Sequence, residues 1–233
     1  IEEGFRQARG ILLELAALGL PTATEILDPI VPQYLADMIS WASIGARTAA
    51  SQVHRQMASG FSMPIGFKNS VGGDLGIAIE GIKAARNPHA FLGITHDGRT
   101  GIATTRGNQY GHLVLRGGVY GPNYQSEYVA YAEVLLKKSN IQNGIVVDCS
   151  HANCHKDFRR QPVVFGEVLQ QVLEGNQSIC GMMIESFLEE GCQPLKQPKT
   201  DLRYGVSITD PCLGWNDTAE LIRRLAKEMK SRH

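Results

Sequence analysis

The stretch that decides the fold runs from Trp41 to Ser70 and reads WASIGARTAASQVHRQMASGFSMPIGFKNS. Two short apolar runs, Trp41–Ala46 and Pro64–Phe67, are each followed by a cation, Arg47 after the first and Lys68 after the second. Between them, apolar residues recur at four-residue intervals, which is typical of a helix. Strand, helix and strand in this order predict a βαβ unit of a parallel sheet, with one cation at each carboxyl end. Ligands bind at that end of parallel strands, so Arg47 and Lys68 are expected to converge on a pocket for an anion.

The same alternation of strands and helices continues along the chain. Strands are predicted at Pro21–Leu27, Trp41–Ala46, Pro64–Phe67, Ala90–Thr95, His112–Arg116, Gly144–Cys149 and Gly181–Glu185, with a β-ribbon over Thr100–Arg106. Helices are predicted from Phe5 to Leu15, closed by Gly19, and over Pro32–Met38, Gly72–Ala85, Asn123–Lys138, Val163–Leu173 and Thr218–Met229. Near-continuous apolar strands alternating with helices indicate a parallel α/β fold.

A (β/α)8 TIM barrel has eight strand–helix units. Here we count six main units, which start near Pro21, Trp41, Pro64, His112, Gly144 and Gly181. The chain also opens on Ile1 inside a predicted helix. We therefore expect one barrel domain over residues 1–233 that is incomplete at its N-terminus and lacks the first two strands. A doubly wound sheet is the alternative, but no GxGxxG motif follows the first strand.

Composition narrows the classes of function. A formal net charge of +0 argues against a nucleic-acid binder, and no apolar run approaches the length of a membrane span. The five cysteines are odd in number and form no CxxC pair, which favours reduced thiols and a cytoplasmic protein.

Charged residues gather at the predicted carboxyl ends of the strands. In chain order they are Glu25, Arg47, Lys68, Arg116, Asp148 with His151, Glu185 and, in a later loop, Asp210. One such charge is as often part of a structural ion pair as of a ligand site, but so many at one level of a barrel favour function. The three cations, Arg47, Lys68 and Arg116, are suited to bind a ligand that carries a phosphate and a carboxylate.

His151, Glu185 and Asp210 follow the last two strands and are expected to meet. One imidazole and two carboxylates suit Mn²⁺, Fe²⁺, Co²⁺ or Zn²⁺. Their spacing is irregular, so the set alone is not a specific motif, and a lone histidine is usually structural or an acid–base group.

Six sequence blocks, in order from Gly45 to Trp215, carry a family resemblance: GARTxxSQVHRxxASG, PxGFKN, LRGG with GPNY, DxSHAN, ESF and SITDxCxGW. Together they closely resemble the type Iα class of 3-deoxy-D-arabino-heptulosonate 7-phosphate (DAHP) synthases. The resemblance implies a TIM barrel and a cytoplasmic transferase. Such an enzyme condenses phosphoenolpyruvate (PEP) with erythrose 4-phosphate at the first step of the shikimate pathway, which leads to the aromatic amino acids.

The resemblance also assigns roles to residues. Those matching the PEP-binding positions are Glu25, Ala46, Arg47, Lys68 and Arg116, and those matching ligands of the divalent metal are His151, Glu185 and Asp210. Lys68 and His151 are the expected catalytic residues. The family's fourth ligand, a cysteine, and its KPRT segment match nothing in these 233 residues, so this chain alone is expected to be inactive.

Feedback inhibition by an aromatic amino acid is a further implication. The matching cavity positions are Pro32, Gln33, Ser62, Phe91 and Gly93. Gly93 stands where phenylalanine-inhibited members commonly have serine, which favours a tyrosine-sensitive or an insensitive enzyme over a phenylalanine-sensitive one. A homo-oligomer, dimer or tetramer, is expected, without nucleic-acid or membrane partners. The alternatives are a 3-deoxyoctulosonate 8-phosphate synthase and a non-catalytic regulatory relative.

Overall fold

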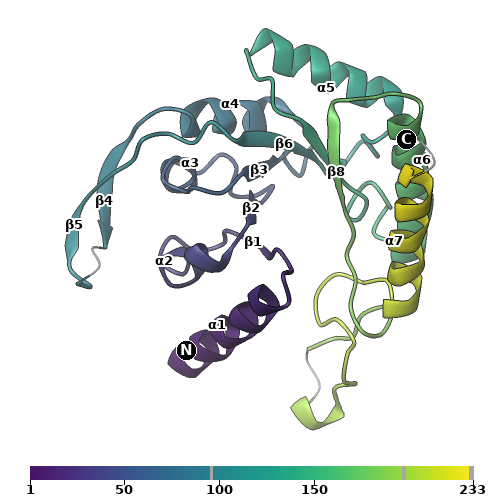
Figure 1. Ribbon diagram of the computed structural model, residues 1–233, viewed down its shortest axis with the longest axis horizontal. Coiled ribbons are helices and arrows are strands. Elements are labelled where there is room, and N and C mark those ends of the chain that lie inside the picture. Colours follow the sequence, from purple (N-terminus) through teal and green to yellow (C-terminus); the bar gives the residue numbers. More distant parts are fainter. Residues whose placement is uncertain (95–96, 196–197, 231–233) are drawn as a thin grey trace. The chain divides into compact units, whose positions relative to one another are not determined.

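The computed structural model describes residues 1–94, 97–195 and 198–230 (Figure 1). The chain forms two compact units, which are described separately. The first unit comprises Ile1–Ser70, Asp74–Leu113 and Ser139–Asn143, and the second Val71–Gly73, Val114–Lys138 and Gly144–His233. The expectation of a single domain stays a prediction.

The main sheet has six strands in the order β1-β2-β3-β6-β7-β8. Its pairs β1–β2, β2–β3 and β7–β8 are parallel. The order follows the chain and never reverses, as it must in a barrel of successive strand–helix units. A doubly wound sheet reverses its order at a switch point, so that alternative is wrong. The predicted parallel α/β class is confirmed.

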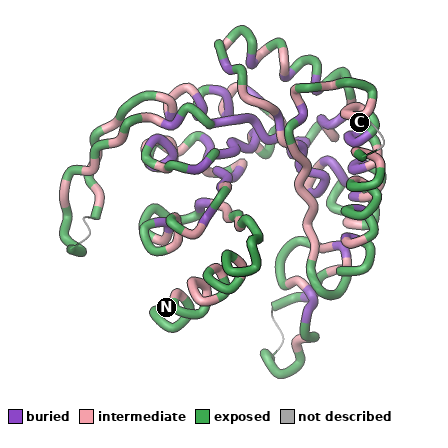
Figure 2. Tube along the Cα trace, viewed as in Figure 1, coloured by how far each residue is buried: buried purple, intermediate pink, exposed green. Residues whose placement is uncertain are grey.

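In the first unit, the helix α1 (Glu2–Ala17) precedes β1 (Ala23–Glu25), and α2 (Pro32–Leu35) with the 3-10 turn η1 (Ala36–Met38) leads into β2 (Trp41–Ile44). The chain then continues through α3 (Gln52–Ala58), β3 (Ile65–Lys68) and α4 (Gly76–Ala85). Every residue of β3 is buried, as the apolar run predicts, whereas α1 buries none (Figure 2).

The helix α4 begins four residues later than predicted. Gly73 has a φ of 100° and belongs to a turn, and the side chain of Asp74 accepts a hydrogen bond from the Gly76 N–H at 2.7 Å. An aspartate that accepts from the first turn in this way marks a helix start.

The strands β4 (Ala90–Ile94) and β5 (Thr100–Thr104) form a separate antiparallel pair, with Leu92 opposite Ile102. Figure 1 shows them as a ribbon that reaches out beyond α3 and α4. The predicted β-ribbon is confirmed, and its partner strand is the predicted strand at Ala90. Thr95, the predicted end of that strand, lies outside the described residues.

The strand β6 (Gly111–Leu115) leads to α5 (Ser126–Lys138), β7 (Ile145–Asp148), the turn η2 (Phe158–Arg160), α6 (Gln161–Leu173) and β8 (Ile179–Met183). The 3-10 turn η3 (Lys199–Asp201) and α7 (Trp215–Lys230) follow. The helix α5 starts three residues later than predicted because the Asn123 side chain is engaged in the loop, where it accepts from the Gly117 N–H at 2.7 Å. The helix α7 starts three residues earlier, at Trp215.

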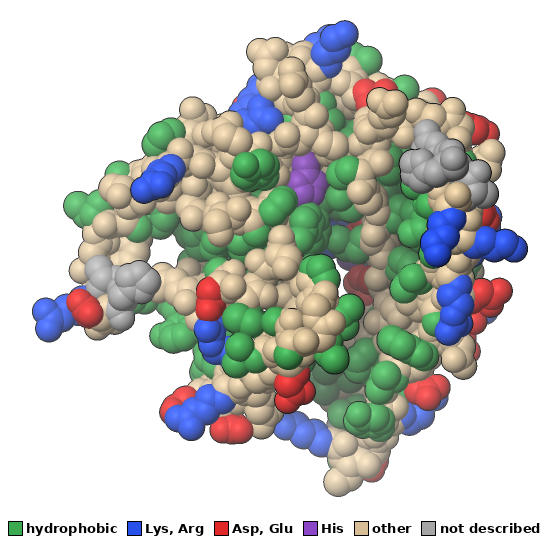
Figure 3. Space-filling view, in the orientation of Figure 1, with side chains coloured by type: hydrophobic (Ala, Val, Ile, Leu, Met, Phe, Trp, Pro, Cys, Tyr) green, Lys and Arg blue, Asp and Glu red, His purple; other side chains and the backbone are tan. Residues whose placement is uncertain are grey.

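On the face shown in Figure 3, positive and negative side chains are interspersed and form no single basic field. In the described part of the chain, no helix combines the length and apolar character needed to cross a bilayer. All five cysteines are free thiols, in agreement with the expectation from their number and spacing.

Candidate functional site

The first unit pairs the carboxyl ends of β1 and β3. Glu25 is the last residue of β1 and Lys68 the last of β3, and β2 lies between these two strands. Lys68 Nζ lies 3.3 Å from Glu25 Oε2. Only 6% of Lys68 is exposed, so its charge needs the carboxylate or an anion as partner. Two of the predicted PEP residues are therefore brought together.

Gly45 leaves the space that the Glu25 side chain occupies. A Cβ at Gly45 would lie 2.3 Å from Glu25 Oε1, which no real structure tolerates without movement. Ala46 is half-buried and Arg47 is exposed, both in the turn after β2. The convergence of Arg47 with Lys68 stays a prediction.

In the second unit, Arg116 follows β6 directly and is 7% exposed. Its carbonyl accepts a hydrogen bond from the Ala152 N–H at 3.2 Å, which joins it to the turn that carries His151. The buried Asn153 supports the same junction, since its side chain donates to Leu115 O at 3.1 Å and to Asp148 O at 2.8 Å. This network places the predicted anion-binding Arg116 beside the predicted metal-binding turn.

His151 lies in a tight turn immediately after β7. Its φ is 52°, a left-handed value that few non-glycine residues adopt, and His155 and Lys156 share it at 54° and 60°. The turn closes through the Lys156 N–H, which donates to His151 O at 2.8 Å. Residues with such unusual backbone dihedrals are concentrated at functional sites.

The three predicted metal ligands come together, with one potential ligand atom from each within 4.8 Å of the others. His151 Nε2 lies 3.5 Å from Glu185 Oε1 and 3.9 Å from Asp210 Oδ2. His151 Nδ1 faces Asp148 Oδ2 at 2.9 Å, so Nε2 is the nitrogen left for a ligand. A neutral Nε2 directed at two carboxylates is favourable when a cation lies between them. The donor set therefore fits a divalent ion of the N- and O-binding class.

A small cavity adjoins this group and is lined by His151, Cys154, Lys156, Glu185, Asp210 and Pro211. Burial raises the pKa of the Cys154 thiol to about 11, and its Sγ donates to His151 O at 3.4 Å. Burial raises the pKa of Cys149 as well. Without a bound metal, both groups are therefore thiols at neutral pH.

Sequence reasoning missed two contributors to these two regions. Gly45 makes room for Glu25, and Ser150 contacts both Asp148 and His151. Asp148 was noted at a strand end but given no role. The DxSH spacing was the signal available for Asp148 and Ser150, because a strand-end aspartate so close to a histidine can reach its ring.

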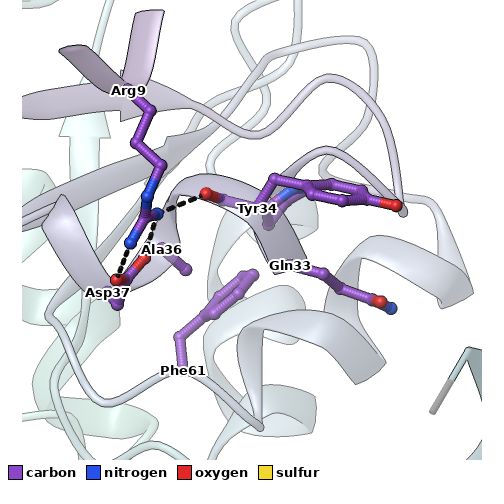
Figure 4. Close-up of a pocket in the computed structure, with 7 residues that line it drawn as sticks. Arg9, Gln33, Tyr34, Ala36, Asp37 and Phe61 are labelled. Carbon is purple, nitrogen blue, oxygen red and sulfur yellow. Dashed lines mark hydrogen bonds and ion pairs between the residues drawn. The ribbon is translucent and has the colours of Figure 1, made fainter. Parts of the chain in front are cut away.

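The first unit also contains a cavity of about 510 Å³ (Figure 4). Its lining residues are Arg9, Pro32, Gln33, Tyr34, Ala36, Asp37 and Phe61. Arg9 forms a two-pronged ion pair with Asp37, at 2.8 and 2.5 Å, and its hydrogen bonds hold the pKa of Asp37 below the usual value.

The predicted effector residues relate to this cavity in different ways. Pro32 and Gln33 line it, and Ser62 follows the lining residue Phe61. Phe91 and Gly93 lie on β4 and are not among its lining residues.

Comparisons with known proteins match residues 1–223 to the DAHP synthetase I family. The Tyr-sensitive phospho-2-dehydro-3-deoxyheptonate aldolase of Salmonella typhimurium (strain LT2) is 48% identical over 229 residues, which are 98% of this chain and 64% of that protein. The Phe-sensitive aldolase of Escherichia coli (strain K12) is 48% identical over 232 residues, 100% of this chain and 66% of the relative.

A solved structure of the phospho-2-dehydro-3-deoxyheptonate aldolase from Francisella tularensis matches with a TM-score of 0.94 at 44% identity. The match covers 99% of this chain and 67% of that one. The chain thus spans about two thirds of the length of the relatives it matches. Nearly all of its residues align with one family, in sequence and in structure, and the chain belongs to the DAHP synthetase I family.

Proposed function

We propose that the chain carries the active-site residues of a DAHP synthase, which joins PEP to erythrose 4-phosphate and releases phosphate. The observation that carries this proposal is the grouping of His151, Glu185 and Asp210 beside the Arg116 junction, within a chain of this family. Aldol-type joining of an enol phosphate to an aldehyde needs anion-binding cations and an electrophile for the aldehyde oxygen, and these residue types supply both.

The cations hold PEP. Arg116 is buried and presents a planar fork to an oxyanion, and Lys68 adds a compact charge that Glu25 holds in place. Arg47 and the backbone of Ala46 complete the proposed set. Fixing both acidic groups of PEP orients its C3 toward the aldehyde. This orientation lowers the entropic contribution to the activation free energy.

His151, Glu185 and Asp210 would hold the divalent ion. When bound, such an ion supplies Lewis-acid polarisation of the aldehyde oxygen. C3 of PEP forms the new bond to the aldehyde carbon, water adds at C2, and cleavage of the C2–O bond releases phosphate. We propose Lys68 as the donor of the proton that the new hydroxyl takes up, since its ammonium lies at the carboxyl end of β3.

Steady-state assays test the proposal with PEP and either erythrose 4-phosphate or a pentose phosphate as acceptor. Turnover with the tetrose and release of one phosphate per product supports it. Preference for the pentose indicates a 3-deoxyoctulosonate 8-phosphate synthase, and binding of PEP without turnover indicates a non-catalytic relative. The expectation that these 233 residues alone turn over slowly stays a prediction for the same assay.

We also propose that the cavity around Pro32 and Gln33 takes an aromatic amino acid as a feedback effector, with tyrosine favoured. Its walls combine apolar and aromatic surface with the Arg9–Asp37 pair, which suits an aromatic ring with a charged end. The relatives include proteins named as Tyr-, Phe- and Trp-sensitive, so the effector is a property of individual members.

Titration of the active enzyme with each aromatic amino acid tests this assignment, and selective inhibition by phenylalanine contradicts it. A Gly93→Ser variant sharpens the test. A Cβ at that position meets the Ala103 Cβ at 3.2 Å, so β4 or β5 must shift slightly to admit the serine. A homo-oligomer and a cytoplasmic location complete the proposal.

A further inference from the structure

The ring of His151 has two nitrogens, and only one can bind a metal while the other holds the ring's proton. In the structure Nε2 faces Glu185 and Asp210, and Nδ1 faces the opposite way, toward Asp148. A metal at Nε2 requires the neutral tautomer that carries its proton on Nδ1. Something must therefore select that tautomer over the other.

Asp148 is placed to make this selection. It is the last residue of β7, is 0% exposed, and its Oδ2 lies 2.9 Å from His151 Nδ1. The ring N–H is not aligned with Oδ2 for a regular hydrogen bond, but an ionised carboxylate at this distance favours a proton on Nδ1 over a lone pair there by its charge. No neighbouring aspartate or glutamate of the metal group faces Nδ1 in this way, because Glu185 and Asp210 lie at Nε2.

Ser150 fixes the orientation of the Asp148 carboxylate. Its backbone N–H donates to Asp148 Oδ1 at 2.9 Å, and its hydroxyl donates to the same oxygen at 2.5 Å. Both donors use Oδ1, so Oδ2 is the oxygen presented to the imidazole. The Ser150 Oγ also lies 2.8 Å from His151 Nδ1, and since its hydrogen is directed at Asp148, it too can only accept there.

The backbone brings the ring into this position. Asp148 O accepts from the buried Asn153 side chain, and the Cys149 N–H donates to Met183 O at 2.8 Å, so the end of β7 is held on both sides. His151 then adopts its left-handed φ, which turns the chain back and places the ring over Asp148.

We propose that Asp148 is a positioning residue that locks His151 in the Nδ1–H tautomer and thereby makes Nε2 a metal ligand. The inference rests on the proposed metal-dependent function for its purpose, but the tautomer itself is a property of the chain without metal or substrate. Carboxylates that hold a ligating histidine in this way typically contribute about 10- to 100-fold in metal affinity.

The decisive variant is Asp148→Asn, which preserves shape. The two Ser150 donors keep the amide oxygen at the Oδ1 position, so the NH₂ group takes the place of Oδ2 and donates toward Nδ1. His151 must then carry its proton on Nε2, where it faces Glu185 and Asp210 and cannot bind a metal. Asp157→Asn is the matched control, because Asp157 lies in the same segment but pairs with Arg159 near the surface.

Two measurements are made on the metal-free chain. Nitrogen-15 NMR at about pH 8.5, well above the ordinary imidazole pKa, reports the tautomer of His151, whose signal is assigned by its absence in His151→Asn. Competition with a chelator then gives the affinity for Mn²⁺. We expect Nδ1–H in the parent chain and in Asp157→Asn, Nε2–H in Asp148→Asn, and about 10- to 100-fold weaker Mn²⁺ binding in Asp148→Asn alone.

An Nε2–H tautomer in the parent chain overturns the proposal, as does an unchanged tautomer in folded Asp148→Asn. A switched tautomer with unchanged Mn²⁺ affinity overturns the ligand role. If Asp148→Asn does not fold, Ser150→Ala decides. Retention of Nδ1–H supports Asp148 as the acceptor, and its loss shows that the hydroxyl was the acceptor. A chain that passes these tests yet lacks synthase activity refutes only the proposed function.

Discussion

The carboxyl ends of β1 and β3 in the first unit and of β7 and β8 in the second place their functional groups by different means. Glu25 and Lys68 are the last residues of regular strands, and the parallel register sets their separation. His151, Glu185 and Asp210 lie beyond the strands, on irregular backbone that includes a left-handed histidine. The proposed anion-binding pair is thus placed by strand register, whereas the candidate metal ligands are placed by loop geometry held by its own hydrogen bonds.

The largest effect is expected where the loop geometry carries the chemistry. An asparagine at position 151 tolerates the left-handed backbone, but His151→Asn removes the imidazole. We expect the affinity for Mn²⁺ to fall by more than about 100-fold, because loss of a direct ligand weakens metal binding more than loss of the carboxylate that supports it. Exhaustive chelation of the full-length enzyme should abolish turnover, and added Mn²⁺ should restore it when His151 is present but not in His151→Asn.

The control is His155→Asn, at a second left-handed histidine four residues on. Its metal affinity should match that of the parent chain. Full turnover after chelation would remove the metal from the mechanism, and equal losses in both variants would mean that the turn as a whole was damaged.

Arg116 tests the proposed assignment of PEP binding to the buried cation after β6. Truncation of a buried charged contact to an oxyanion costs about 2–5 kcal/mol, so Arg116→Ala should raise the KM for PEP far more than that for the tetrose. Arg159→Ala, an exposed arginine of the same unit, should leave both KM values unchanged. A shift confined to the tetrose KM would contradict the assignment of Arg116 to PEP.

A smaller effect is expected from Gly45→Ala at the strand ends. The new Cβ would lie 2.3 Å from Glu25 Oε1, so the carboxylate of Glu25 must move away from Lys68. The change should cost little stability, because Glu25 Oε1 is the end of a flexible side chain that can move, and it should appear mainly as a higher KM for PEP. Gly10→Ala, in α1 with nothing within 4 Å, is the control and should not change kinetics. Unchanged PEP binding in Gly45→Ala would make the Glu25–Lys68 pair merely structural.

The smallest effect concerns the thiols near the metal group. Burial raises the pKa of Cys154 to about 11, so its reactive thiolate is scarce at pH 8 and its alkylation should accelerate as the pH rises toward that value. The exposed Cys192 should be modified first, as mass spectrometry of the alkylated chain can show. Early modification of Cys154 would mean that the turn after β7 opens readily.

The sequence was sufficient for the fold class because its signal is local and repeated. Short strand-like runs identified all six main strands, and their regular alternation with helices indicated a parallel sheet. Boundaries were less accurate where side chains override the pattern. The Asp74 side chain accepts from the Gly76 N–H in the turn before α4, and Asn123 accepts from the Gly117 N–H in the loop before α5.

By itself, then, the sequence determined the six strand units and the charges at their ends, since residue type and spacing along the chain are enough for both. Its resemblance to one family pointed to the three candidate ligands. Only the tertiary structure decided that Gly45 makes room for Glu25, that the Ala152 N–H ties Arg116 to the His151 turn, and that Asp148 faces Nδ1. These contacts depend on backbone dihedrals and side-chain directions. A left-handed turn at a histidine leaves no periodic trace in the sequence, so which ring nitrogen it presents is settled only when the chain is folded.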